Sequence, residues 1–293
     1  MSRNNIALAI SGVAVFGLSI LLATHLVSES GKHRWATSSA DTVLEALDAF
    51  KEEGFDPEVA LKEGATRIPP IFLAELPDDL RGMKDIDRRK AVFVAIVLPH
   101  VLRANDRLRE DRARLDRLHR ANMSEKTLPK RDRKWLARMA NSYRTAPMDI
   151  EALLKRVDVV PPRLAIAQAI QESGWGTSRF ARAGNALFGQ HAPTGPGTIV
   201  ARGDSAVAMK AFDTISRSVL DYMRNLNSHR AYREFREMRA QMRARGRPMD
   251  AMALATSLGR YSEQGTLYVE RLQSVMQLPE VAAARGAKLA EEE

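Results

Sequence analysis

The chain has 293 residues, a formal charge of +9 and no cysteine. The length allows one sizeable domain or two small ones, and the lack of thiols excludes disulfides and thiolate chemistry. The positive charge suits an acidic partner such as anionic lipid or an anionic wall polymer, whereas nucleic acid is not favoured, because no zinc spacing, phosphate loop or aromatic-interleaved RNA motif is present.

The first predicted element is a hydrophobic segment close to the N-terminus. No charged residue occurs in the stretch IALAISGVAVFGLSILL, from Ile6 to Leu22. About 20 apolar residues are needed to cross a bilayer, and no convincing small-x-small cleavage motif follows. We therefore predict an uncleaved signal anchor at residues 1–28, with residues 6–27 in the membrane, and an exported protein. A cleaved signal peptide is the alternative.

The next part of the chain is predicted to be helical. A short helix follows Asp41 and ends at Gly54, and a proline-rich connector leads to a long helix that starts near Asp85. In this helix Val101, Leu108 and Leu115 recur every seven residues between charged side chains. This pattern is typical of a long, solvated helix with one apolar seam. Further helices are predicted at 131–143 and 148–157.

A region rich in glycine and proline follows residue 184 and interrupts the helices. Its sequences TIVA and SAVAMKAF flank Arg202-Gly203-Asp204 and predict a short β-hairpin. Helices resume at Ser216 and continue nearly to the end of the chain. The low aromatic content of 6% and the many Ala, Leu and Met residues agree with a mainly helical fold.

One of these later helices carries arginines at every third position. They are Arg230, Arg233, Arg236 and Arg239. We interpret them as a solvated helix face on which Glu234 and Glu237 serve as partners. A surface for anionic lipid or for the peptide carboxylates of a cell wall is the alternative.

The stretch AIAQAIQESGWG places a carboxylate at the end of an apolar helix. Leucine, isoleucine and alanine cover most of the circumference of this helix, which predicts that it is buried. The helix begins at Pro161-Pro162 and Gly174 is placed to end it, so Glu172 lies in the last turn. The helix dipole and burial both raise the pKa of Glu172, and Trp175 is a candidate apolar wall. A glycosidic general acid requires this environment; a helix-end glutamate that points into water is the alternative.

The same region resembles a known family. The stretch AQAIQESGWGTSRFARAGNALFGQ is similar to the signature of the glucosaminidase domain of glycoside hydrolase family 73, and within it to Bax-type bacterial proteins. The segments RRKAVFVAIVLPHVLRAND, AFDTISRSVLDYMRNLNSHRAYREFR and LGRYSEQGTLYVERL extend the resemblance over roughly residues 68–276. It implies a mainly α, lysozyme-like helical body with a small β-hairpin lobe, preceded here by the N-terminal transmembrane helix. It also implies that Glu172 is the catalytic acid in peptidoglycan cleavage.

Other site residues follow from the resemblance. Tyr261 would line the groove near Glu172, unless it only packs on the core, and Trp175, Asn185 and Phe188 would shape the substrate-binding turn and wall. Most glycosidases use a second carboxylate, and Asp204 is the only acid in the predicted lobe; an ordinary turn aspartate is the alternative. N-acetyl sugars can instead supply their own acetamido oxygen as nucleophile.

These observations lead to one prediction for the whole chain. After the signal anchor come a linker with a short helix (29–67), a helical extension (68–145), the glucosaminidase domain (146–280) and a flexible tail (281–293). We predict an endo-β-N-acetylglucosaminidase of the inner membrane that acts on peptidoglycan in the periplasm, or a periplasmic one if the anchor is cleaved. No metal or organic cofactor is implied. The alternatives are a weak or inactive peptidoglycan-binding scaffold and a lytic transglycosylase.

Overall fold

Helices make up most of the described part of the chain. The computed structural model describes residues 37–291, apart from residues 39, 125–126 and 202–203. The α-helices are α1 (Val43–Glu52), α2 (Pro57–Lys62), α3 (Ile86–Met123), α4 (Lys130–Tyr143), α5 (Ile150–Arg156), α6 (Pro162–Ser173), α7 (Arg179–Gly184), α8 (Ile215–Ser228), α9 (Arg233–Ala244), α10 (Ala251–Ala255), α11 (Thr266–Val275) and α12 (Pro279–Ala282). The 3-10 helices are η1 (Asp78–Gly82), η2 (Arg230–Tyr232) and η3 (Thr256–Tyr261). The strands are β1 (Thr37–Ser38), β2 (Arg67–Ile68), β3 (Phe72–Leu73), β4 (Thr198–Ala201), β5 (Asp204–Lys210) and β6 (Lys288–Leu289).

The predicted membrane segment falls outside this description. Residues 1–28, including the proposed span 6–27, are not among the described residues. Across the ranges that the structure does describe, none of the helices combines the length and the apolar character needed to cross a bilayer. The signal anchor therefore stays a prediction from the sequence.

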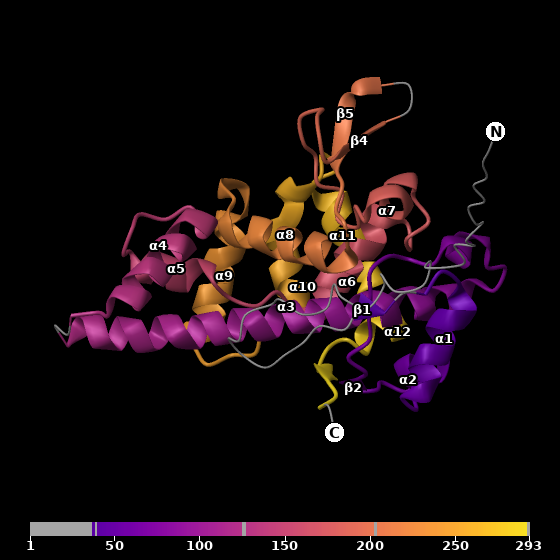
Figure 1. The fold of residues 1–293 in the computed structure, drawn as a ribbon, viewed down its shortest axis with the longest axis horizontal. Helices are drawn as coiled ribbons and strands as arrows, with labels where there is room; N and C mark the ends of the chain where they lie inside the picture. The colour runs from indigo at the N-terminus through magenta and orange to yellow at the C-terminus, as the bar shows by residue number, and fades with distance from the viewer. Residues whose placement is uncertain (1–36, 39, 125–126, 202–203, 292–293) are drawn as a thin grey trace, which may run out of the picture. The chain divides into compact units, whose positions relative to one another are not determined.

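Helix α3 is the central element of the body formed by residues 36–293 (Figure 1). Asp85 caps it by accepting a hydrogen bond from the backbone N–H of Arg88 at 3.0 Å. Every residue from Ala91 to Leu102 is buried, because α2, α6, α8 and α12 all pack against α3. The prediction of a solvated helix is therefore wrong for this half. It holds only for the second half, where the seam residues Leu108 and Leu115 are buried between exposed charges.

The arginine series on η2 and α9 forms the predicted solvated face only at its start, where Arg233 is exposed and pairs with Glu237 at 3.6 Å. Residues three apart in a helix are rotated by about 300°, so the series drifts from the surface into the interior. Arg236 is 6% exposed and Arg239 is fully buried. Arg239 donates to the backbone carbonyl of Asp158 at 3.1 Å, and Arg243 donates from Nε to the Asp158 carboxylate at 2.8 Å. These arginines therefore tie α9 to the segment that precedes α6.

The hairpin and the C-terminal segment complete the body. Strands β4 and β5 pair antiparallel, with Val200 opposite Ala208, which confirms the predicted hairpin. The flexible tail predicted for 281–293 is wrong as far as residue 290. Val281 and Ala284 are buried, β6 pairs with β2, and the N–H of Ala290 donates to the Ile68 carbonyl at 2.8 Å. The C-terminal segment thus closes the fold against the N-terminal connector.

Candidate active site

Helix α6 places Glu172 at the end of a buried helix. Leu164, Ile166 and Ala169 have no exposed surface, and Pro162 occupies the first turn. Gly174 adopts a positive φ of 59° and its N–H bonds the Ile170 carbonyl at 2.9 Å, which ends the helix. The predicted helix, its start and its glycine stop are confirmed. Glu172 therefore lies in the last turn, as expected.

Tyrosines gather around the Glu172 carboxylate. Four of the five tyrosines in the chain lie close enough for the charge of Glu172 to raise the pKa of their hydroxyls. They are Tyr222 of α8, Tyr232 of η2, Tyr261 of η3 and Tyr268 of α11. Burial raises the pKa of Glu172 from its ordinary value of 4.5 to about 7, although a hydrogen bond from Tyr268 opposes the shift. Near neutral pH, a large fraction of Glu172 therefore carries a proton.

Gln168 connects two of these tyrosines to Glu172. It lies one turn before Glu172 on the same face of α6. Its Oε1 accepts from the Tyr222 hydroxyl at 2.7 Å, and its Nε2 donates to the Tyr268 hydroxyl at 2.9 Å. Since the Tyr268 oxygen accepts from Gln168, its own proton is directed to the Glu172 carboxylate. This chain of hydrogen bonds orients the Glu172 carboxylate, while burial sets the direction of its pKa shift.

The backbone of Gly189 lies beside the Glu172 carboxylate and leaves no room for a side chain at position 189. Its φ is +58°, and a Cβ at this position would lie 2.5 Å from Oε2 of Glu172. The neighbouring Phe188 is held from two sides: its ring stacks on Tyr222 with centroids 3.9 Å apart, and its carbonyl accepts from the Tyr261 hydroxyl at 2.8 Å. The backbone at 188–189 therefore forms one rigid wall of the site.

The other predicted substrate-binding residues differ in burial and in what they contact. Asn185 and Phe188 are 4% and 1% exposed, and Asn185 donates to the Phe212 carbonyl at 3.1 Å, so both shape the wall from inside. Trp175 packs edge-on against Phe93 of α3, with centroids 6.1 Å apart. The role of Trp175 as an apolar wall beside Glu172 stays a prediction. The roles of Trp175, Asn185, Phe188 and Tyr261 in substrate binding stay predictions.

Two aspartates lie at or near the hairpin, one predicted from the sequence and one found only in the structure. Asp204 begins β5, where its backbone lies opposite Ala201, but its side chain falls outside the description, so its catalytic role stays a prediction. Asp221 of α8 was not expected from the sequence. Its Oδ2 accepts from Gln190 Nε2 at 3.0 Å and from Lys210 Nζ at 2.8 Å.

Asp221 links the base of the hairpin to the wall of the site. Lys210 is the last residue of β5, and its backbone N–H donates to the Gln190 carbonyl at 2.8 Å. Gln190 directly follows Gly189, which contacts Glu172. Asp221 thus holds together α8, the end of β5 and the segment that covers the carboxylate. No sequence motif marks this role, because the partners lie 31 and 11 residues away.

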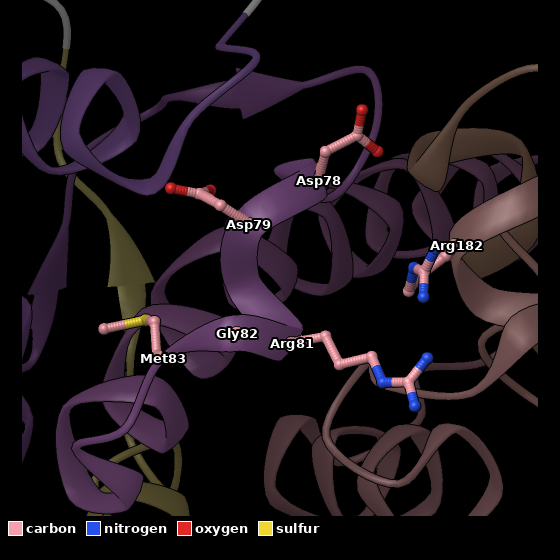
Figure 2. A pocket seen from close by; sticks show the side chains of 6 residues that line it. All are labelled: Asp78, Asp79, Arg81, Gly82, Met83 and Arg182. Atoms are coloured by element: carbon pink, nitrogen blue, oxygen red, sulfur yellow. The ribbon is translucent and has the colours of Figure 1, made fainter.

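A separate hollow of about 520 Å³ lies between η1 and α7. Figure 2 shows that Arg81 of η1 and Arg182 of α7 both project into it. Asp79 at its edge is already engaged, because its Oδ1 accepts from the backbone N–H of Val43 at 2.8 Å. Glu172 does not line this hollow.

Comparisons with known proteins identify the family of the chain. Residues 148–279 match the glucosaminidase family described as mannosyl-glycoprotein endo-beta-N-acetylglucosaminidase, a range that contains Glu172, Gly189 and Tyr268. The chain is 33% identical over 217 residues to the protein bax of Escherichia coli strain K12, which covers 70% of this chain and 74% of that protein. The crystal structure of the catalytic domain of the autolysin Auto from Listeria monocytogenes aligns with 58% of this chain and 96% of that chain, at 15% identity and a TM-score of 0.34.

Proposed function

The chain belongs to the family of Bax-type bacterial proteins with a glucosaminidase domain, and on this premise we propose that it cleaves the glycan strands of peptidoglycan as an endo-β-N-acetylglucosaminidase. The observation that carries the proposal is Glu172 itself. Burial raises its pKa to about 7, while Gly189 and the tyrosines hold it in place. A general acid works best when its pKa lies near the working pH.

The proposed reaction begins with proton transfer from Glu172. Its carboxyl proton passes to the glycosidic oxygen as the bond from that oxygen to the sugar C1 breaks. The positive charge that develops on C1 is stabilised either by the acetamido oxygen of the substrate or by a second carboxylate, for which Asp204 is the candidate. Water then attacks C1, its oxygen becomes the new C1 hydroxyl, and its proton passes to the Glu172 carboxylate, which restores the acid.

The released ends identify the reaction. Wild-type protein is incubated with purified peptidoglycan and the soluble products are analysed by mass spectrometry. We expect new reducing N-acetylglucosamine ends. Anhydro-muramic ends would instead identify a lytic transglycosylase, and binding to peptidoglycan without any release would identify a scaffold. Either of these two outcomes overturns the proposal.

We also propose a location for the activity. The uncharged stretch from Ile6 to Leu22 is long enough for a membrane anchor, which would hold the domain at the inner membrane on the periplasmic side. The alternative is cleavage of this segment and a free periplasmic protein. The mass of the mature N-terminal peptide separates the two.

The role of Asp221 in this reaction leads to a further prediction. Asp221→Ala removes the acceptor shared by Gln190 and Lys210 and loosens the wall over Glu172. We expect kcat to fall about tenfold, since small displacements of a catalytic group are costly, while the far-UV circular dichroism spectrum is unchanged. Asp213→Ala, at an exposed position just before α8, is the matched control and should retain wild-type kcat. Equal activities of the two variants would contradict the positioning role.

A further inference from the structure

A second and larger cavity lies at the opposite end of α6 from Glu172. Its volume is about 900 Å³. It is formed by the start of α6, the segment between α9 and α10, and the C-terminal segment from Ala284 to Lys288. Pro162 and Glu172 are ten residues apart in one helix, which corresponds to about 15 Å. The cavity is therefore distinct from the candidate active site.

The side chains around this cavity are strongly cationic. The cationic residues that line it are Arg109, Arg163, Arg247, Arg285 and Lys288. Asp250 is the only acid among its lining residues in the described part of the chain, and its Oδ1 accepts from the N–H groups of Met252 and Ala253 at the start of α10. The whole chain has 45 basic and 36 acidic residues, so the ratio at this cavity is far from the average.

These positive charges are only partly compensated. Arg109 pairs with Asp106, and Arg163 donates to the Met276 carbonyl at 2.5 Å. Burial, and after it the charge of Arg285, lowers the pKa of Arg163, and the charge of Asp250 opposes this shift only in part. Among the residues that the structure describes, none of the ion pairs involves Arg247, Arg285 or Lys288. An anionic group that entered the cavity would relieve this repulsion.

The floor of the cavity is apolar. Val159, Pro162, Met242, Met252 and Ala253 line it and are only partly buried. The fitting ligand therefore combines carboxylates for the rim with small apolar groups for the floor. A lipid chain would meet five cationic residues around only a few apolar side chains. A nucleic acid would bring bases that need aromatic platforms, which are absent from the lining residues. A short acidic peptide rich in alanine satisfies both requirements.

We propose that this cavity binds the alanine-containing, carboxylate-bearing peptide stems of peptidoglycan, so that the protein holds its polymer at a site separate from the one that cleaves it. The inference rests on the proposed function, because peptidoglycan supplies the stems. Arg247 and Arg285 are exposed at the rim and bind the stem carboxylates. The methyl groups of alanine lie against Met242 and Met252.

The methionines of the cavity allow binding to be observed without any cleavage. Met242, Met249 and Met252 line the cavity, and the chain has 12 methionines in total. Full-length protein with 13C-labelled methionine methyl groups is titrated with a synthetic stem tetrapeptide that has free carboxylates. We expect saturable shifts of the three cavity methyls, whereas those of the buried Met139 and Met223 stay in place. The same peptide with amidated carboxylates should cause no shift.

Variants test whether the rim arginines are responsible. The double substitution Arg247→Gln and Arg285→Gln should weaken peptide binding about tenfold or more, because it removes two charge-assisted contacts. The matched control is Arg81→Gln with Arg182→Gln, which removes the same charge from the other hollow (Figure 2) and should leave binding unchanged. Equal weakening by both pairs, or binding of the amidated peptide, overturns the proposal.

The outcome is independent of glycan cleavage. If the stem peptide shifts the cavity methyls but no glycan ends are released, the proposed enzyme function fails and the binding site stands. If glycan ends are released but the methyls do not move, the binding site fails and the enzyme function stands.

Discussion

Replacing Glu172 with glutamine is expected to lower kcat on peptidoglycan about 1,000-fold, because the amide has the shape of the acid but cannot donate a proton to the leaving oxygen. KM should change little, since the hydrogen-bonding geometry at Tyr268 is retained. The measurement is the rate of release of reducing ends from purified peptidoglycan.

Glu270→Gln is the control for this experiment. Glu270 lies on α11 with Tyr268, but it is exposed. This variant replaces a carboxylate by an amide, as Glu172→Gln does, but on the helix that carries Tyr268. It should keep wild-type activity. A Glu172→Gln variant that retains more than a tenth of wild-type kcat would remove Glu172 from the mechanism.

The raised pKa of Glu172 gives the experiment a pH dependence. Because the protonated form is the acid catalyst in the proposed mechanism, kcat/KM should fall as the pH rises through about 7. The free energy of unfolding that protonation of Glu172 contributes should also fall as the pH rises. The folded state binds the Glu172 proton more tightly than the unfolded state, so this contribution is complete below pH 4.5 and is lost as the pH passes about 7. Glu172→Gln should therefore melt at a higher temperature than wild type at pH 8, with a smaller difference at pH 5.

Local sequence patterns predicted the elements of the site correctly. The apolar circumference of α6, the prolines at its start and the glycine at its end are all short-range features. They placed Glu172 in the last turn of a buried helix. The hairpin was equally accessible, because two β-prone stretches flank one turn. Each of these predictions depends on residues within about a dozen positions of one another.

The surroundings of Glu172 depend on contacts that no local pattern records. Gln168 bonds Tyr222 across 54 residues and Tyr268 across 100 residues. The one available signal was Gln168, a polar residue within the apolar run of α6, four residues before Glu172. Burial of Arg239 and of the first half of α3 was also missed, because charge spacing and heptads describe one helix and not its neighbours. Tertiary packing decides such cases.

Gly189→Ala is the substitution that tests this packing most directly, with an expected loss of about 100-fold in kcat. A methyl group at this position would lie 2.5 Å from Oε2 of Glu172, so the carboxylate must move, and misplacement of a catalytic group by about 1 Å costs a factor of this size. The positive φ of 58° adds a cost of about 1 kcal/mol in unfolding free energy. Reducing-end release and thermal melting measure the two effects separately.

Two glycines of the hairpin region separate the steric effect from the backbone effect. Gly197 has a similar positive φ of 74°, but a Cβ there meets nothing within 4 Å. Gly197→Ala should therefore lower stability and leave kcat near wild type, whereas Gly195→Ala, which is neither at positive φ nor crowded, should change neither. If Gly189→Ala loses no more activity than Gly197→Ala, the wall at 188–189 does not position the acid. If kcat falls in Gly189→Ala but not in Gly197→Ala, then the Glu172 carboxylate can donate its proton in the right place only because residue 189 has no side chain.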